Sequence, residues 1–306
     1  MNSSRLWAIV GATGTGKTGA SIDLAQRLQE ERGTQVEIVN ADSMQFYRNM
    51  NIGTAKLPAT EWQGIEHHLF DVFDVTEEAT VAWYQPAARA TIQDIFSRGH
   101  DAILVGGSGL YVSSVLFDFN FPPRDEQLRA KLEAEAEAGG VQPLLDQLRQ
   151  IDARAAEAVD AKNPRRVVRA LEIALLGEAA QVTLPQQPTL WCDRTTVLGL
   201  HCDRQVLVDR LDRRVEEMWR HGLLHEVSEL QRAGIERGKT ASRAIGYAQA
   251  LAQLRHELSE AEAIAHTQAL TRRYARRQVS WFKRYPEVRW IDVTNGQNVA
   301  HLAPID

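Results

Sequence analysis

Short apolar runs alternate with helix-patterned segments along most of this chain. Five runs of four to six residues have the length and the valine, isoleucine and leucine content of buried strands. Between them, apolar side chains recur at helical spacing, as at Ile22, Leu24, Ala25 and Leu28. Such alternation is typical of an α/β fold, a parallel sheet flanked by helices. The predicted strands are 6–10, 36–39, 102–105, 195–200 and 290–293, and further helices are predicted over about 84–96 and 204–220.

The pattern changes between residue 117 and about residue 190. A proline pair, Pro122-Pro123, is followed by alanine-, leucine- and charge-rich sequence without a strand candidate. Leucines at positions 128, 132, 144, 145 and 148 fall at helical spacings. We therefore expect a core formed by residues 1–116 and 191–306, interrupted by a helical insertion domain at 117–190.

The composition is that of a globular protein, since 44% of the 306 residues are hydrophobic and 25% are charged. A net charge of −5 argues against a uniformly basic nucleic-acid-binding surface but leaves local basic patches open. Cys192 and Cys202 are too few for a disulfide framework or a zinc site, and they indicate reduced thiols of a cytoplasmic protein. The first strand leaves no room for a signal peptide before it, and no apolar run has membrane-spanning length.

The segment between the first strand and the first helix matches the phosphate-binding pattern G-x-x-x-x-G-K-[ST]. Glycines let successive backbone N–H groups turn toward a ligand, and the helix start adds the positive end of its dipole. Lys17 adds a mobile positive charge, and the Thr18 hydroxyl is a candidate ligand of Mg²⁺. A tight turn without a ligand is the alternative, and the pattern does not say which phosphate binds. The candidate phosphate-binding residues are Gly11, Ala12, Thr13, Gly14, Thr15, Gly16, Lys17 and Thr18.

Two further strands end in segments with candidate chemistry, and parallel sheets bind ligands at these strand ends. The second strand leads into residues 40–45, so that the carboxylate of Asp42 is expected near the phosphate loop. The third leads into Gly106-Gly107-Ser108-Gly109-Leu110-Tyr111, where a P-loop nucleotidase usually has an aspartate for Mg²⁺. The glycines in place of this aspartate suggest that another molecule approaches the backbone closely. The absence of the aspartate at this strand end also argues against a kinase. His67 and His68 are interpreted as loop-fixing residues, because adjacent side chains point in different directions.

Two basic segments are candidates for contact with RNA phosphates. Residues 162–169 hold four positive charges before an apolar helix, although a solvated helix face is the commoner meaning of such a run. Residues 272–284 hold six basic side chains interleaved with Tyr274, Trp281 and Phe282 and followed by Tyr285. A stripe of this kind can hold phosphates and stack on bases. The alternative is a helix whose aromatic side chains pack in the core while the arginines lie outside.

Taken in order, these motifs resemble those of the bacterial tRNA dimethylallyltransferases, the isopentenyl transferases that act on tRNA. The resemblance covers nearly the whole chain. It implies a P-loop NTPase-like core and transfer of a dimethylallyl group from dimethylallyl diphosphate to N6 of the adenosine beside the anticodon (position 37), with release of diphosphate. In that family the phosphate loop holds the prenyl diphosphate rather than ATP. The matching segments are 11–18, 42–45, 52–56, 67–69, 106–111, 165–172, 210–218, 222–223, 242–247 and 274–282.

The resemblance also implies roles for individual residues. Asp42 matches the general base that accepts the N6 proton, and a helix-capping or Mg²⁺-associated aspartate is the alternative. Arg214 is expected to meet the diphosphate together with Lys17 and Thr18, with Mg²⁺ as the cofactor. We expect a monomer that binds the anticodon stem-loop, partly through the insertion domain, and takes a target base, flanked by two further adenosines, out of the anticodon stack. The residues expected to contact tRNA are Asp42, Ser43, Met44, Gln45, Ser108, Arg129, Arg165, Arg166, Val167, Val168, Arg169 and Arg243.

The chain departs from the family pattern in two places. Residues 11–15 read Gly-Ala-Thr-Gly-Thr where proline and then alanine-serine are more frequent, and Ala248 stands where an arginine is common, which leaves an RNA contact there open. Three other functions also remain open. They are a P-loop kinase of a small metabolite, a prenyltransferase of free adenine nucleotide, which tends to have lysine in place of Ser43, and a non-catalytic RNA-binding module.

Overall fold

A six-stranded parallel sheet forms the centre of the chain, in the order β3-β2-β4-β1-β5-β6. The computed structural model describes residues 4–119, 121–122, 124–178, 188–296 and 299–302. The predicted α/β class is confirmed, and each of the five predicted strands is present. The two-residue β3 was not predicted, because so short a strand has no hydrophobic pattern of its own. The strands are β1 (Leu6–Gly11), β2 (Val36–Asn40), β3 (His67–His68), β4 (Asp101–Gly106), β5 (Thr195–His201) and β6 (Val288–Asp292).

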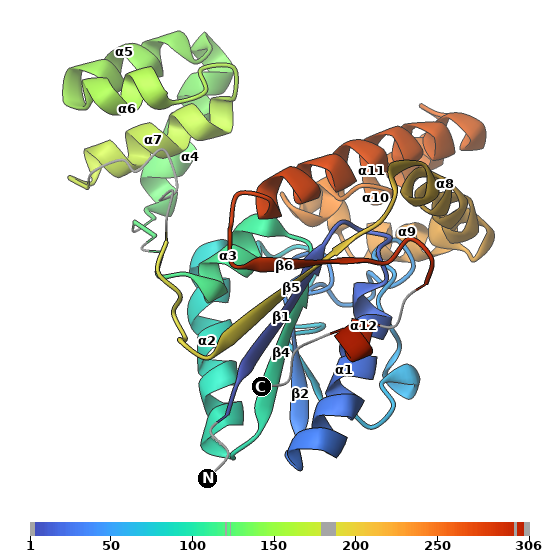
Figure 1. Ribbon diagram of the computed structural model, residues 1–306. Helices are drawn as coiled ribbons and strands as arrows, with labels where there is room; N and C mark the ends of the chain where they lie inside the picture. The colour runs from blue at the N-terminus through green and yellow to red at the C-terminus, as the bar shows by residue number, and fades with distance from the viewer. Residues whose placement is uncertain (1–3, 120, 123, 179–187, 297–298, 303–306) are drawn as a thin grey trace. The chain divides into compact units, whose positions relative to one another are not determined.

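The helices α1 (Lys17–Arg32) and α2 (Val81–Ser97) lie on opposite sides of this sheet (Figure 1). The chain moves from β1 to β2 in one direction along the sheet and returns from β2 to β4 in the other. Right-handed crossovers then require the two connecting helices to cover opposite faces. On the α1 side, a cluster of fully buried side chains joins the helix to the sheet, including Trp7, Ile9 and Leu24.

The remaining elements of the core are helices that follow β4, β5 and β6, together with three short 3₁₀ turns. The predicted helix over 204–220 is observed with these bounds: Asp203 caps its start by accepting N–H groups of Gln205 and Val206, and the left-handed Gly222 lies just beyond its end. The elements are α3 (Gly109–Leu116), α8 (Arg204–Arg220), α9 (Leu223–Arg232), α10 (Tyr247–Leu254), α11 (Glu260–Phe282) and α12 (Val299–Leu302), with the short 3₁₀ turns η1 (Ala59–Glu61), η2 (Ile235–Arg237) and η3 (Ala241–Arg243).

The chain divides into two compact units, one formed by residues 1–118 and 189–306 and the other by residues 119–188. The sequence predicts this insertion at 117–190. The second unit is helical, and its leucine, valine and alanine side chains form a core of their own, which includes Leu132, Leu148 and Leu171. Its helices are α4 (Glu126–Gly139), α5 (Gln142–Ile151), α6 (Ala153–Ala158) and α7 (Pro164–Leu175).

The parallel arrangement brings three strand ends to one edge of the sheet. β1, β2 and β4 are neighbours or next neighbours, so the segments that follow Gly11, Asn40 and Gly106 lie together. This edge is where an open α/β sheet binds its ligands. Within the described ranges, no helix combines the length and apolarity needed to cross a bilayer.

Candidate active site

The loop between β1 and α1 has the backbone that its glycines permit. Gly14 and Gly16 both have φ of 82°, in the left-handed region. Gly11 has φ of 145°, and a Cβ there would lie 2.5 Å from the carbonyl oxygen of Leu200. The close approach therefore requires glycine at position 11, and the left-handed φ favours glycine at positions 14 and 16. The loop ends at the first turn of α1, where backbone N–H groups and the helix dipole favour an anion.

Polar contacts within the loop hold it in this shape. The Thr15 hydroxyl and the Lys17 ammonium both donate to the Ala12 carbonyl, each at 2.8 Å. Burial, opposed by the charge of Asp42 and aided by that of Arg214, lowers the pKa of Lys17 to about 8. Lys17 is therefore a cation whose charge is poorly compensated, and an anionic ligand would stabilise it.

Asp42 follows β2 and has a fixed orientation. Its Oδ1 accepts the backbone N–H of Met44 at 3.0 Å, and its own N–H donates to Asn40 Oδ1 at 2.9 Å. The backbone carbonyl of Asn40 accepts a hydrogen bond from the buried Tyr84 hydroxyl at 2.7 Å. Asp42 thus forms a local turn contact, which differs from the helix cap named as an alternative to a catalytic role. Only Oδ1 is used in this contact among the described residues, so Oδ2 remains available for a ligand.

Arg214 reaches the same place from α8. Its Nη1 lies 3.4 Å from Thr13 Oγ1 and its Nη2 lies 3.5 Å from the Thr54 carbonyl oxygen, both long contacts. Its Nε is buried without a hydrogen-bond partner in the described part of the chain. Burial lowers the pKa of Arg214, opposed by the charge of Asp42. A buried guanidinium with unused donors is suited to an anionic ligand.

One cavity joins these groups. Its polar wall includes Lys17, Thr18, Asp42 and Arg214, and apolar side chains form another part of it. The cations can hold a diphosphate while the apolar part accepts a short hydrocarbon. The apolar lining comes from Ile38, Ala55, Leu57, Phe70 and Val105.

The glycines after β4 were interpreted as room for another molecule, and the structure corrects this. A Cβ on Gly106 would lie 2.6 Å from the backbone of Ala41. A Cβ on Gly107 would lie 2.3 Å from Gln278 Nε2, and one on Gly109 would lie 2.4 Å from the Trp281 ring. The close approach is made by the chain's own segments. Gln278 is nearly fully buried and bridges the site, because its Nε2 donates to the Gly107 carbonyl and its Oε1 accepts the Thr13 N–H, each at 2.8 Å.

Several residues predicted to contact RNA lie at the same sheet edge. Ser43 Oγ and Ser108 Oγ are 3.4 Å apart, and Gln45 Nε2 donates to the Thr54 carbonyl at 3.1 Å. Tyr274, predicted only as part of the basic segment, also lies here, with its hydroxyl 3.5 Å from Ser108 Oγ. Burial, with the charge of Asp42 adding to it, raises the pKa of Tyr274 to about 12. No local pattern of the basic segment could have indicated this, because Ser108 and Tyr274 are 166 positions apart in the chain.

The helical unit uses part of its predicted RNA-binding run for its own structure. Arg169 Nη1 lies 2.9 Å from the fully buried carboxylate of Glu172, and Arg129 Nη1 lies 3.5 Å from it. The side chains of Val167 and Val168 are wholly buried in the core of this unit, so they cannot contact RNA and only their backbone remains for that role. The side chains of Arg165 and Arg166 are exposed, as is Arg243 in η3 of the other unit.

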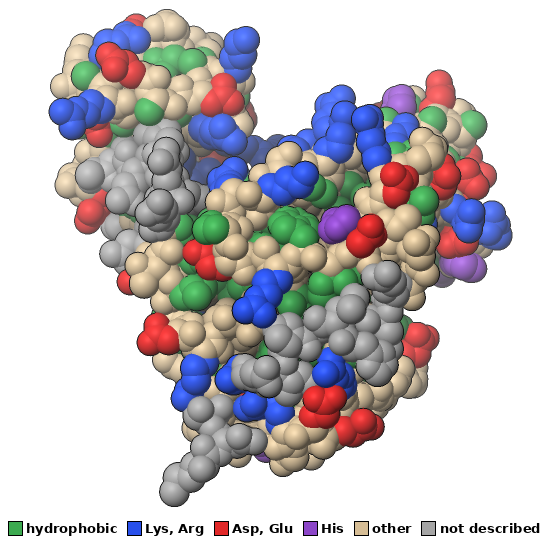
Figure 2. Space-filling view, in the orientation of Figure 1, with side chains coloured by type: hydrophobic (Ala, Val, Ile, Leu, Met, Phe, Trp, Pro, Cys, Tyr) green, Lys and Arg blue, Asp and Glu red, His purple; other side chains and the backbone are tan. Residues whose placement is uncertain are grey.

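Helix α11 and the turn after it bury some of their aromatic side chains and leave most of their basic side chains exposed. Phe282 is buried, as is Tyr285 just beyond the helix, whereas Arg277 and Arg284 lie over the rings of the half-buried Tyr274 and Trp281. Lysine and arginine side chains gather over this helix in Figure 2. The exposed basic residues of α11 and the turn after it are Arg273, Arg276, Arg277, Lys283 and Arg284.

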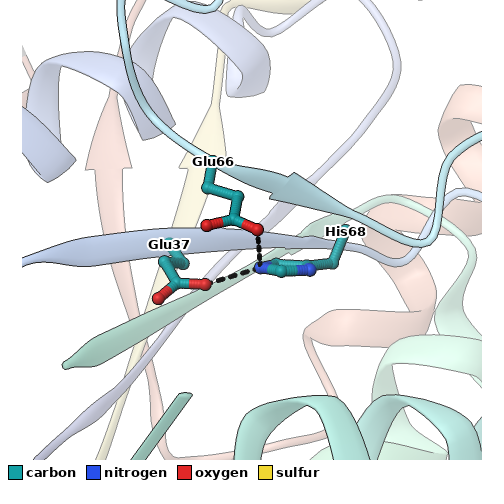
Figure 3. A group of neighbouring side chains, drawn as sticks. All are labelled: Glu37, Glu66 and His68. Carbon is teal, nitrogen blue, oxygen red and sulfur yellow. Dashed lines mark hydrogen bonds and ion pairs between the residues drawn. The ribbon is translucent and has the colours of Figure 1, made fainter. Parts of the chain in front are cut away.

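A separate acidic and histidine cluster holds the edge strand β3. His68 Nε2 lies 2.6 Å from Glu37 Oε2 and 3.8 Å from Glu66 Oε1 (Figure 3). His100 and Arg98 also bind the Glu37 carboxylate, at 2.6 and 2.9 Å. A divalent cation would have to displace a guanidinium here, so the cluster is a network of ion pairs.

His67 points elsewhere than His68 and stacks on Trp62 with ring centroids 4.5 Å apart. Its Nδ1 lies 2.9 Å from the Ile65 carbonyl oxygen, an acceptor, so Nδ1 carries the proton. Burial lowers the pKa of His67. Both histidines therefore fix the segment that carries them, in different directions.

Comparison with known proteins gives a consistent result. A family model described as IPP transferase matches residues 45–285. The chain is 53% identical to a tRNA dimethylallyltransferase of Clavibacter sepedonicus over 294 residues, which cover 96% of this chain and 95% of that protein. It is 58% identical to a tRNA dimethylallyltransferase of Leifsonia xyli over 258 residues, which cover 84% of this chain and 98% of that protein.

Solved structures agree with the sequence relatives. A tRNA isopentenylpyrophosphate transferase from Bacillus halodurans superposes with a TM-score of 0.69 at 39% identity, covering 98% of this chain and 94% of that one. A eukaryotic dimethylallyltransferase acting on tRNA superposes with a TM-score of 0.77 at 28% identity, covering 96% of this chain and 75% of that one. The predicted P-loop NTPase-like core is confirmed by these likenesses. This chain belongs to the IPP transferase family.

Proposed function

We propose that this chain transfers a dimethylallyl group from dimethylallyl diphosphate to N6 of an adenosine in tRNA, the one at the 3′ side of the anticodon. Its relatives are tRNA dimethylallyltransferases by name. The observation that carries the proposal is that the carboxylate of Asp42 and the cations Lys17 and Arg214 line one cavity. A base for one substrate and a cradle for the leaving group of the other thus lie at the same place.

The diphosphate is assigned to the loop and the two cations. When the allylic C–O bond breaks, its electron pair moves onto the diphosphate, whose growing charge is met by Lys17, Arg214 and the N–H groups at the start of α1. The apolar part of the cavity receives the dimethylallyl carbons. Because these donors are held in place before the reaction, they need little reorganisation during it.

The site also fits Mg²⁺. The Thr18 side chain is exposed at the start of α1 and shares the cavity with the oxygens of Asn40, Asp42 and Gln45. Mg²⁺ prefers oxygen ligands and keeps several waters while binding phosphates. Thr18 would hold the ion, which supplies positive charge to the diphosphate.

The adenine amine is a poor nucleophile, because its lone pair is delocalised into the ring. As N6 attacks the allylic carbon and the new C–N bond forms, a proton leaves N6 and moves to the carboxylate of Asp42. General base catalysis of this kind typically contributes 10²–10⁴-fold to a rate. The contact between Asp42 Oδ1 and the Met44 N–H fixes the carboxylate while leaving Oδ2 for this proton.

The RNA is assigned to the exposed basic side chains of α11 and to the helical unit. Arg273, Arg276 and Arg277 are exposed on α11, the helix that also carries Tyr274 and Gln278 into the site. Arg165 and Arg166 are exposed in the helical unit. A single-stranded loop base costs little to extrude, which suits an anticodon-loop target. Since one chain supplies base, cradle and basic surface, we propose that it acts as a monomer.

The test is transfer of label from radioactive dimethylallyl diphosphate to tRNA, to AMP or to no acceptor, in the presence of Mg²⁺. We expect label in tRNA only, on an adenosine beside the anticodon. Label in AMP alone would contradict the proposal and indicate a nucleotide prenyltransferase. Transfer of phosphate from ATP without any prenyl transfer would indicate a kinase.

A further inference from the structure

A turn formed by Asn51–Lys56 contributes to the wall of the cavity through Thr54 and Ala55. It is closed by the Thr54 hydroxyl, which donates to the Met50 carbonyl at 2.6 Å, and by the Lys56 N–H, which donates to the Asn51 carbonyl at 3.0 Å. Ala55 has φ of 48°, a left-handed conformation that is unfavourable for a residue with a Cβ. Such a conformation persists only where surrounding contacts hold it.

The Lys56 side chain holds one end of the turn by donating to the Tyr47 carbonyl and to Asp71 Oδ1. At the other end, successive backbone N–H groups meet one carboxylate, that of Glu226 in the first turn of α9. Glu226 Oε2 accepts the backbone N–H groups of Asn51 at 3.1 Å and Ile52 at 2.8 Å, and Oε1 lies 3.4 Å from the N–H of Gly53. Oε1 also accepts the hydroxyl of Tyr247 at 2.6 Å. Four donors on one carboxylate are a strong anchor, because hydrogen bonds to a charged acceptor are about twice as strong as neutral ones.

Tyr247 fixes this anchor from the other side. Its side chain is fully buried at the start of α10, and burial beside Glu226 raises its pKa well above the usual value, so it remains a donor. Its ring also packs directly on Gly53, where a Cβ would lie 2.4 Å from a ring carbon. The turn is thus held between a carboxylate and a phenol ring.

The anchored turn connects the two halves of the proposed site through one carbonyl group. The Thr54 carbonyl accepts Gln45 Nε2 at 3.1 Å and lies 3.5 Å from Arg214 Nη2. Gln45 is predicted to contact tRNA, and Arg214 is assigned to the diphosphate. A displacement of the turn would therefore move both groups, and a misplacement of about 1 Å can cost a hundredfold in rate.

We infer that Glu226 is a positioning residue of the transferase: it fixes the turn Asn51–Lys56, so that the Thr54 carbonyl sets Arg214 and Gln45 at their working separation. The inference rests on the proposed function for its catalytic consequence. Glu226 itself touches neither substrate, and its effect passes through the turn.

The test is Glu226→Gln, which keeps the side-chain length. Its amide oxygen can still accept the N–H groups of Asn51 and Ile52, but the negative charge is lost and an NH₂ replaces the Oε1 that accepts the Tyr247 hydroxyl and faces the Gly53 N–H. We expect kcat for label transfer to fall about tenfold and affinity for inorganic diphosphate to fall about fivefold, while KM for tRNA changes less than twofold and the melting temperature by only a few degrees. Tyr247→Phe removes one of four donors and should give a smaller loss of kcat. The double variant should lose less than the product of the two single effects, because both act on one anchor.

Glu229→Gln is the matched control, since Glu229 lies on the same helix, is exposed and pairs only with Arg232 among the described residues. It should behave as wild type. Unchanged kcat and unchanged diphosphate affinity in Glu226→Gln would overturn the inference, as would a loss of activity matched by an equal loss of folded protein. If the wild type itself transferred no label, the proposed function would fail, and the diphosphate measurement would still decide whether Glu226 sets Arg214.

Discussion

Replacing Asp42 by asparagine removes the proposed base with little change of shape. The asparagine Oδ1 can still accept the Met44 N–H, the contact that Asp42 makes at 3.0 Å. The turn after β2 should therefore survive, and only the negative charge and the proton-accepting ability are lost. We expect kcat to fall by about 10²–10⁴-fold, the usual contribution of a general base, which corresponds to about 2.7–5.5 kcal/mol in activation free energy.

The structure adds a second consequence of this substitution. Burial lowers the pKa of Lys17, and the charge of Asp42 partly opposes this effect, so that the pKa is about 8. Without that charge the pKa of Lys17 falls further, so a larger fraction of Lys17 is neutral near pH 8. Asp42→Asn should therefore bind diphosphate with an affinity that declines at a lower pH than in the wild type.

The assay is single-turnover transfer of label from dimethylallyl diphosphate to tRNA, with tRNA binding measured separately. Asp23→Asn on the exposed face of α1 is the control and should be unchanged. The reasoning would be refuted if Asp42→Asn kept kcat within a few-fold of wild type. It would equally be refuted if the loss lay in tRNA affinity with kcat intact, since Asp42 would then be a binding residue.

Three further predictions concern buried polar groups. Gln278→Met leaves the Thr13 N–H and the Gly107 carbonyl without their partner. We expect a loss of about 1–3 kcal/mol in unfolding free energy, measured by denaturant titration. We also expect a raised KM for dimethylallyl diphosphate, measured by steady-state kinetics. Diphosphate affinity should fall as pH rises through about 8, because Lys17 loses its proton there. In calorimetric titrations Lys17→Arg should remove this pH dependence, since arginine keeps its proton. A wild-type affinity that does not change with pH would contradict this prediction. Burial raises the pKa of Glu37, but the contacts with His100, His68 and Arg98 outweigh burial and lower this pKa overall. The ionised Glu37 therefore stabilises the fold above its unfolded pKa, and this stabilisation is lost as the pH falls through the lower folded pKa. In a plot of unfolding free energy against pH, Glu37→Gln should flatten the decline on the acid side.

The parts of the fold that the sequence predicted are those governed by local patterns. The predicted bounds of α8 match the observed ones, and both ends are fixed by neighbours in the chain, the cap at Asp203 and the left-handed Gly222. The phosphate loop likewise depends on its own glycines. Hydrophobic runs of sufficient length revealed five strands, whereas β3 depends on pairing with β2 and on the contact between His68 and Glu37.

The parts that the sequence could not predict depend on partners far away in the chain. Gln278 meets Thr13 across 265 positions, and Glu226 meets Ile52 across 174. The glycines after β4 indicated a close approach but not that the chain itself makes it. Nor could a run of charges distinguish the exposed Arg165 from Arg169, which pairs with a buried glutamate.

The most direct test of the central claim is a crystal structure with an anticodon stem-loop RNA and the unreactive thiolo analogue of dimethylallyl diphosphate. The account predicts N6 of the extruded adenosine about 2.6–3.2 Å from a carboxylate oxygen of Asp42, with the diphosphate on residues 13–18 and against Arg214. An adenine amine out of reach of Asp42, or a diphosphate bound away from the loop, would contradict it.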